Sequence, residues 1–125
     1  MKKAYYAHCK AIYDTKQEKD DVKRIREMGF RVVNPNSDAY KARIADMKYN
    51  GCCGKEIMDY FLKVASQCDV MVFRALPDGE IPAGVHKEVQ LFIDSKKPVV
   101  ELPFLKKRKV LSIIQTANYT REYRK

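Results

Sequence analysis

The hydrophobic positions of this chain form short apolar runs separated by longer segments in which only one helical face is apolar. Residues 69–73 (Asp-Val-Met-Val-Phe) are apolar after their first residue, which is typical of a strand buried on both faces of a parallel sheet. The other runs of strand length are 4–7, 30–33, 99–102 and 110–114. Apolar residues at helical spacing predict helices over 15–28, 55–67 and 84–95.

Alternation of strands and helices predicts an α/β protein with a mostly parallel five-stranded sheet. We expect one domain over residues 1–125, built as a three-layer α/β/α sandwich of flavodoxin or Rossmann type with strand order 2-1-3-4-5. In such sheets ligands bind at the carboxyl ends of the strands, where the loops 8–14 and 74–83 would meet. Residues 34–54 have a weaker pattern, which fits either a mobile flap over a site or an irregular helix and loop.

Turn and cap residues support these boundaries. Thr15 and Glu18 have the spacing of a capping box, so a helix is expected to begin there. Gly29 follows Met28 at the position where a helix often ends with a left-handed residue. In the loop 74–83, Pro77, Asp78 and Gly79 are strong turn formers before the next helix begins at Gly84.

Glu88 is the most unusual polar residue of that helix. On a helical wheel it falls near Phe92 and Leu91, at the edge of the apolar face, whereas Asp94 lies on the opposite, polar face. A carboxylate beside apolar neighbours is costly to desolvate, and its pKa rises unless it is paired. Glu88 is therefore either a functional acid near a helix N-terminus or a boundary residue that reaches solvent or a lysine.

Composition narrows the class of protein. An apolar content of 46% excludes general disorder, and no apolar run reaches membrane-spanning length. The first residues lack a signal-peptide core, so we expect a cytoplasmic protein without membrane contact. We expect no metal and no cofactor, with reduced cysteines. A zinc site built from His8 and the cysteines is the alternative, and the cysteines are Cys9, Cys52, Cys53 and Cys68.

The net charge of +9 reflects basic residues gathered at 106–109 and in the last five positions. Such a run is most often a solvated face, but a basic balance also suits phosphate-bearing partners, from nucleotides to nucleic acid. No groove-reading motif is present, so nucleic acid is not the favoured partner.

Three motifs in order resemble the nucleoside 2-deoxyribosyltransferase-like family, which includes nucleoside deoxyribosyltransferases and deoxynucleotide N-hydrolases. They are Cys68–Val72, the GxxxE motif Gly84–Glu88, and Lys97–Val100, within a resemblance that spans about residues 4–103. The resemblance implies that Glu88 is the nucleophile that attacks the anomeric carbon of a nucleoside or nucleotide. It also implies that members are homo-oligomers whose sites border a neighbouring subunit.

The resemblance assigns further roles by position. Tyr13 matches a tyrosine that orients the nucleophile, and Asp59 is the nearest match to an aspartate that contacts the base or sugar. Asp59 lies ten residues before Asp69, about two more than the family pattern, and Asp78 is the alternative acid. The remaining substrate-binding candidates lie at the loop after the first strand and at the helix start: His8, Gly84, Val85 and His86.

These residues suit cleavage of an N-glycosidic bond. A carboxylate beneath the anomeric carbon stabilises the oxocarbenium-like sugar or bonds to it, and a second acidic group assists the leaving base. Amides at the helix start could hold a 5′-phosphate. A non-catalytic nucleotide-binding module of the same fold is the alternative function. A homodimer or larger assembly is expected from the resemblance and from the number of tyrosines, namely Tyr5, Tyr6, Tyr119 and Tyr123.

Overall fold

A parallel sheet forms the centre of the protein. The computed structural model describes residues 1–76, 79–102, 113–114 and 117–118. Its sheet has four strands in the order β2-β1-β3-β4, all of them parallel. The strands are β1 (Lys3–Ala7), β2 (Arg31–Val33), β3 (Val70–Phe73) and β4 (Val99–Glu101). The predicted α/β class and the predicted order of the first four strands are confirmed.

Helices connect the strands, as crossovers between parallel strands require. They are the 3-10 helix η1 (Lys10–Ile12), α1 (Lys16–Glu27), α2 (Asp38–Tyr49), α3 (Gly54–Ser66) and α4 (Ala83–Asp94). The segment predicted as a flap or an irregular helix contains the regular twelve-residue α2. In the part of the chain that the structure describes, no helix is long and apolar enough to cross a membrane.

Alternate side chains of β1 and β3 point to opposite faces of the sheet, so the two faces have separate cores. Tyr5 and Met71 pack on the face covered by α3 and α4, together with Phe92 of α4. Tyr6 and Val72 pack on the other face, with Ile25 of α1. Burial on both faces explains why the run 69–73 contains no alternation of polar and apolar residues.

The structure bears on two further expectations from the sequence. The predicted strand over 110–114 lies mainly outside the described residues, and residues 113–114 are helical. Tyr5 and Tyr6 are both fully buried. These two tyrosines therefore belong to the core and do not argue for an interface, whereas Tyr119 and Tyr123 lie outside the described residues.

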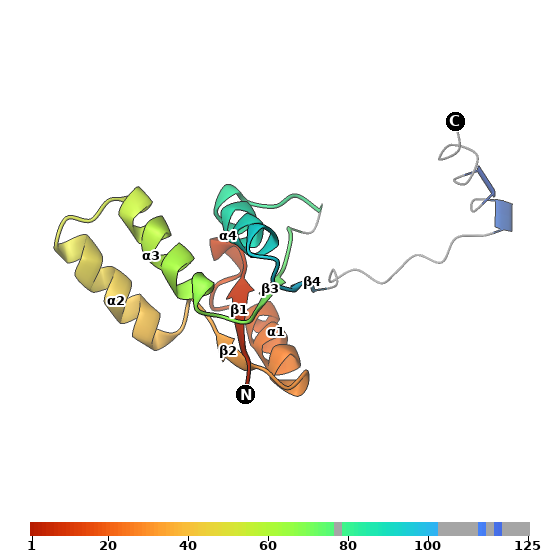
Figure 1. Ribbon diagram of the computed structural model, residues 1–125, viewed down its shortest axis with the longest axis horizontal. Coiled ribbons are helices and arrows are strands. Elements are labelled where there is room, and N and C mark those ends of the chain that lie inside the picture. The colour runs from red at the N-terminus through yellow and green to blue at the C-terminus, as the bar shows by residue number, and fades with distance from the viewer. Residues whose placement is uncertain (77–78, 103–112, 115–116, 119–125) are drawn as a thin grey trace.

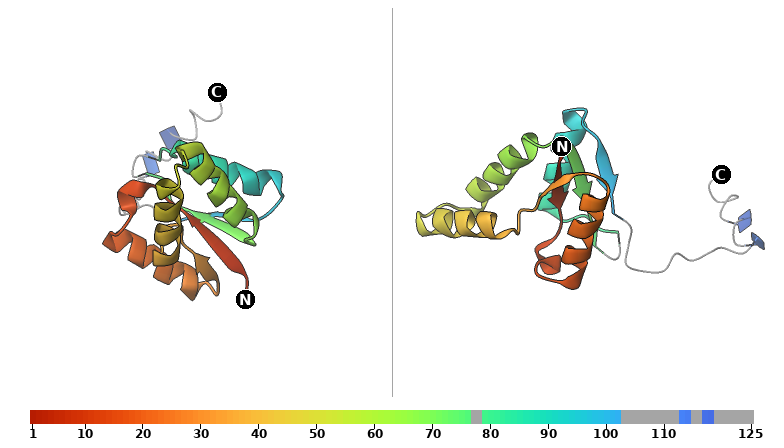
Figure 2. Two further views of the ribbon diagram at one scale, coloured as in Figure 1. Left: turned by 90° about the vertical axis from the view of Figure 1, so that its left-hand side faces the viewer. Right: turned by 90° about the horizontal axis from the view of Figure 1, so that it is seen from below.

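Helices α2 and α3 form a hairpin that extends away from the sheet (Figure 1), and the right-hand view of Figure 2 shows the same projection. No residue of α2 is buried. Tyr40 of α2 contacts Tyr60 and Phe61 of α3, with ring centroids 6.5 and 6.1 Å apart. Helix α3 also packs against α4, whereas the end of α2 lies at the tip of the hairpin, away from the sheet (Figure 1).

Candidate functional site

A cavity of about 520 Å³ opens at the carboxyl end of β1. Its walls come from β1 and the loop that follows it, the end of α2, the first half of α3, and the start of α4. This is the edge at which open α/β sheets bind ligands. The lining residues are Tyr5, His8, Cys9, Lys10, Tyr13, Pro35, Lys48, Cys52, Gly54, Ile57, Met58, Phe61, Pro82, Gly84, Val85 and Glu88.

Glu88 is the single carboxylate among these lining residues. It lies on the second turn of α4 and is only 8% exposed, and it forms no ion pair with another described residue. Burial raises the pKa of Glu88 to about 7. The boundary alternative, a glutamate that reaches solvent or a lysine, is therefore wrong for this fold.

Tyr5 is the polar group that acts most directly on Glu88. Its hydroxyl is buried and has no partner of full hydrogen-bond geometry among the described residues. Interaction with Tyr5 lowers the pKa of Glu88, but by less than burial raises it. Burial also raises the pKa of Tyr5, and the nearby Glu88 charge raises it further. The phenol therefore keeps its proton and can donate it to the ionised carboxylate.

Tyr13 also lines the cavity and lies directly after η1. Burial raises the pKa of Tyr13 to about 12, with smaller contributions from the charges of Glu88 and Glu18. Tyr13 thus stands within electrostatic range of Glu88, as its predicted role requires. Tyr5 interacts with the carboxylate more closely, and sequence reasoning missed it because an aromatic residue inside a strand usually belongs to the core.

The rest of the cavity divides into an apolar wall and a basic rim. Ile57, Met58 and Phe61 of α3 supply the apolar wall, and Lys10 and Lys48 are exposed cations at the rim. Neither lysine forms an ion pair with another described residue. Such a cavity accommodates a ligand with an apolar body and an anionic group.

The start of α4 also borders the cavity. Pro82 is its N-cap, and no side chain caps the first free amides. A Cβ added at Gly84 would meet Met58 Sδ at 3.6 Å, which is an ordinary van der Waals contact. The backbone conformation therefore does not require glycine at position 84. The absence of a side chain there leaves room on the cavity side of the helix start.

A buried network holds the loop that carries Tyr13. The side chain of His8 is fully buried, and its Nε2 lies 2.7 Å from Glu18 Oε2. Its Nδ1 lies 3.1 Å from the Tyr6 carbonyl oxygen. Since both partners can accept a hydrogen bond, the imidazole donates to both of them only when both of its ring nitrogens carry a proton. Burial lowers the pKa of His8, whereas the hydrogen bonds to Glu18 and Tyr6 raise it.

The same network explains a deviation from the expected capping box. Thr15 Oγ1 accepts a hydrogen bond from the Glu18 amide at 3.3 Å, so the helix begins as predicted. The Glu18 carboxylate does not return the bond to Thr15. It accepts instead from the Asn36 side chain at 3.0 Å and from the Asp14 amide at 3.3 Å. Glu18 thereby ties the loops after β1 and β2 together.

The His8 ring links this hydrogen-bonded network to Tyr13 in the cavity wall. It stacks on Tyr6, with centroids 3.8 Å apart and an interplanar angle of 5°, and it contacts Tyr13 at 4.8 Å. The hydroxyl of Tyr6 donates a hydrogen bond to Asp21. Asp21 also accepts hydrogen bonds from Nε and one terminal nitrogen of Arg74 at 2.6 and 2.8 Å. His8 lines the cavity, but both of its nitrogens are already engaged, so it positions Tyr13 and offers a ligand only a ring face.

The predicted site residues separate into three groups. Glu88, Tyr13, His8, Gly84 and Val85 line the cavity, and the fold brings them together as expected. Asp59 and His86 are exposed and do not line it. Asp78 lies outside the described residues. Asp59 lies on the solvent-exposed face of α3, while Met58 and Phe61 of the same helix line the cavity.

Several lining residues have no signal in the sequence that marks them as functional. Lys48 and Cys52 enter the cavity only because α2 and α3 fold into a hairpin. Cys9 and Cys52 are both partly exposed, Cys53 is exposed and Cys68 is buried, and all four are free thiols. Among the described residues no group of three or more histidine, cysteine or acidic side chains could hold a metal ion.

Comparison with models of known protein families finds no match to this chain. Comparison with curated proteins also finds no similar sequence.

Proposed function

We propose that this protein cleaves or transfers at the N-glycosidic bond of a nucleoside or nucleoside 5′-monophosphate, deoxynucleosides included, with Glu88 as the nucleophile. One observation carries the proposal. A carboxylate is buried without a cationic partner among the described residues, in the wall of a cavity at the carboxyl edge of the sheet. Such a placement opposes stability, and perturbed acids in clefts are characteristic of functional sites.

The two kinds of cavity wall suggest how a substrate lies. The apolar side chains of α3 suit the flat faces of a nucleobase. Lys10 and Lys48 at the rim, together with the uncapped amides of α4, suit a phosphate group. Glu88 would then lie beneath the sugar, between the two ends of the ligand. This division favours a phosphorylated substrate over a plain nucleoside.

In the proposed reaction the ionised Glu88 carboxylate forms a bond to the anomeric carbon as the bond to the base nitrogen breaks. Tyr5 donates its hydroxyl proton toward the carboxylate and orients it. The base leaves with the bonding electron pair and takes a proton from solvent or from a cavity group, and water or a second base then accepts the sugar. Tyr13, whose ring contacts His8, would form part of the cavity wall beside the sugar.

The decisive experiment compares release of free base from deoxynucleosides and their 5′-monophosphates by the wild type and by Glu88→Gln. Loss of the nucleophile is expected to lower cleavage by a factor on the order of 10³ or more, while folding and ligand binding persist. Asp94→Asn is the matched control, because Asp94 is exposed on the same helix. Cleavage by Glu88→Gln within about tenfold of the wild type would refute the mechanism.

A nucleotide-binding module without turnover is the second candidate function. It is favoured by the position of Asp59, which leaves Glu88 as the only acidic side chain among the described residues that line the cavity. A general acid for the leaving base is then missing from these residues. Binding of a nucleotide by both the wild type and Glu88→Gln, with no base released by either, would support this function instead.

We also propose that the protein forms a homodimer or larger assembly in the cytoplasm. We further propose that the chain is a three-layer α/β/α sandwich whose sheet contains a fifth strand. The projecting α2–α3 hairpin supports assembly, because α2 has no buried residue and Tyr49 at its end is 90% exposed. Light scattering at micromolar concentration is expected to give at least twice the mass of one chain. A monomer under these conditions would contradict the proposal.

A further inference from the structure

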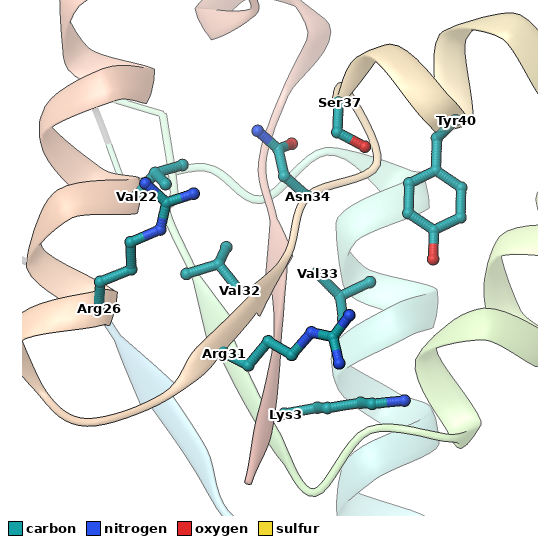
Figure 3. A pocket seen from close by; sticks show the side chains of 9 residues that line it. All are labelled: Lys3, Val22, Arg26, Arg31, Val32, Val33, Asn34, Ser37 and Tyr40. Atoms are coloured by element: carbon teal, nitrogen blue, oxygen red, sulfur yellow. The ribbon is translucent and has the colours of Figure 1, made fainter. Parts of the chain in front are cut away.

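A second hollow, of about 290 Å³, lies along the outer edge of β2. Its lining comes from β1, α1, β2, the segment after β2, and the first turn of α2. None of these residues lines the Glu88 cavity. The lining residues are Lys3, Val22, Arg26, Arg31, Val32, Val33, Asn34, Ser37 and Tyr40 (Figure 3).

Three cations line this hollow without a counter-charge. Lys3, Arg26 and Arg31 are exposed, and none forms an ion pair with another described residue. No carboxylate is among the lining residues. The nearby Asp69 accepts the backbone amide of Lys3 at 2.8 Å, rather than pairing with its ammonium group. Grouped like charges repel, and an anionic partner would relieve this repulsion.

The arrangement of donors is specific. Figure 3 shows Lys3, Arg31 and Tyr40 on the same side of β2, with the Tyr40 hydroxyl directed toward the two cations, while Arg26 approaches from α1 on the other side. Burial raises the pKa of Tyr40, and the charge of Arg31 opposes this, as expected of groups that share one hollow. A guanidinium fork, an ammonium and a phenol hydroxyl all donate to phosphate oxygens.

We propose that this hollow is a binding site for a phosphate group, carried either by a free nucleotide or by a nucleic-acid strand. Arg31 would bind two phosphate oxygens, Lys3 would supply a point charge, and Tyr40 would donate a third hydrogen bond. Asn34 and Ser37 lie at the end of the hollow for the remainder of the ligand. This site is independent of the Glu88 reaction.

Charges on an edge strand have another use, because they prevent pairing with other strands. That role needs neither a hollow nor a hydroxyl directed toward the cations, and it predicts that no phosphate binds. An extended acidic peptide that pairs with the free edge of β2 is a second competing occupant. The experiment therefore includes ligands that separate these cases.

Amide spectra of the full ¹⁵N-labelled chain would be followed during titration with inorganic phosphate, adenosine monophosphate, an oligothymidylate of about ten residues, and an acidic peptide of similar length. Shifts confined to Lys3, the residues 31–37 and Tyr40 report the proposed site, whereas shifts at Tyr13 and Glu88 report the cavity. Localised binding of phosphate and the mononucleotide would identify a free ligand. Localised binding of the oligonucleotide alone, with a steep salt dependence, would identify a strand.

The joint change Lys3→Gln and Arg31→Gln is expected to weaken localised binding by about tenfold or more. The control is Lys23→Gln with Arg24→Gln, which removes equal charge from exposed positions of α1 that do not line the hollow, and it should change affinity by less than about threefold. Arg31→Lys keeps the charge but loses the fork, so it tests the geometry if the double variant does not fold.

Three results would overturn the proposal. The first is the absence of any localised shift with all three phosphate ligands, as edge protection predicts. The second is an equal loss of binding in the control variant, which would show only general attraction to a basic chain. The third is localised binding of the acidic peptide alone, which would assign the edge to a protein partner.

Discussion

Replacing Glu88 with glutamine removes a charge that the fold buries unfavourably. The pKa of Glu88 rises from an ordinary 4.5 to about 7 in the folded chain. A group with a raised folded pKa binds its proton more tightly when folded, so the carboxyl destabilises the fold increasingly as pH rises from about 4.5 through about 7. A shift of this size corresponds to about 3 kcal/mol at high pH.

Glutamine has nearly the same shape and stays neutral, so Glu88→Gln should avoid this penalty. The free energy of unfolding of the variant is expected to exceed that of the wild type by a margin that is about 2 to 3 kcal/mol larger near pH 8 than near pH 5. Urea denaturation at both pH values measures it, provided that the m-value is unchanged. A stabilised but inactive variant would indicate that the fold accepts a cost in stability for function.

The exposed Asp94 on the same helix is the control, because Asp94→Asn changes the same chemical group without removing a buried charge. Its stability relative to the wild type should vary little between the two pH values. The reasoning fails if Glu88→Gln shows no greater advantage at high pH than at low pH. Such a result would mean that Glu88 reaches water or a cation in solution.

Three further predictions follow from the same site. If Glu88 acts as the ionised nucleophile, kcat/KM for base release should rise with pH to a plateau, with a midpoint near 7. A rate that falls through this range would make Glu88 a general acid. Glu18→Gln removes the charged partner of buried His8 and should lower the free energy of unfolding by about 3 kcal/mol, measured by urea denaturation, with a loss of order at Tyr13 in amide spectra. An unchanged Tyr13 environment would separate that loop from the network. A 5′-monophosphate should bind better than its nucleoside in calorimetry, and Lys48→Gln and added salt should each narrow the gap. Equal affinities at low and high salt would exclude a phosphate contact.

The sequence alone predicted the features that depend on neighbouring residues. The unbroken apolar run 70–73 indicated a fully buried strand, and β3 is buried at every position. Thr15 marked the start of α1, and Gly29 adopts the positive φ of 94° expected after a helix end. These signals are local, since helix and strand periodicity and cap chemistry depend on residues a few positions apart.

Glu88 was selected for the same reason, because a wheel needs only the residues of its own helix. Its burial, however, depends on Tyr5 and on α3, which lie far from it in the sequence. The position of Asp59 outside the cavity lining could not be predicted with the same certainty. A shift of one or two positions on a helix turns a side chain from a cavity to solvent, and spacing to Asp69 could not decide between these directions.

Only the tertiary structure decided which separate segments share a cavity. Lys48 lines the same cavity as Glu88 because the turn between α2 and α3 joins the end of α2 to the start of α3, which packs against α4. The sequence could not identify His8 and Glu18 as a pair, because a histidine in a loop near the sheet edge is equally consistent with a ligand-binding role. In the structure both ring nitrogens of His8 already have hydrogen-bond partners, and the ring packs against Tyr13. Local patterns encode the elements, whereas cavities and buried ion pairs arise from contacts between elements, which no single segment of the sequence specifies.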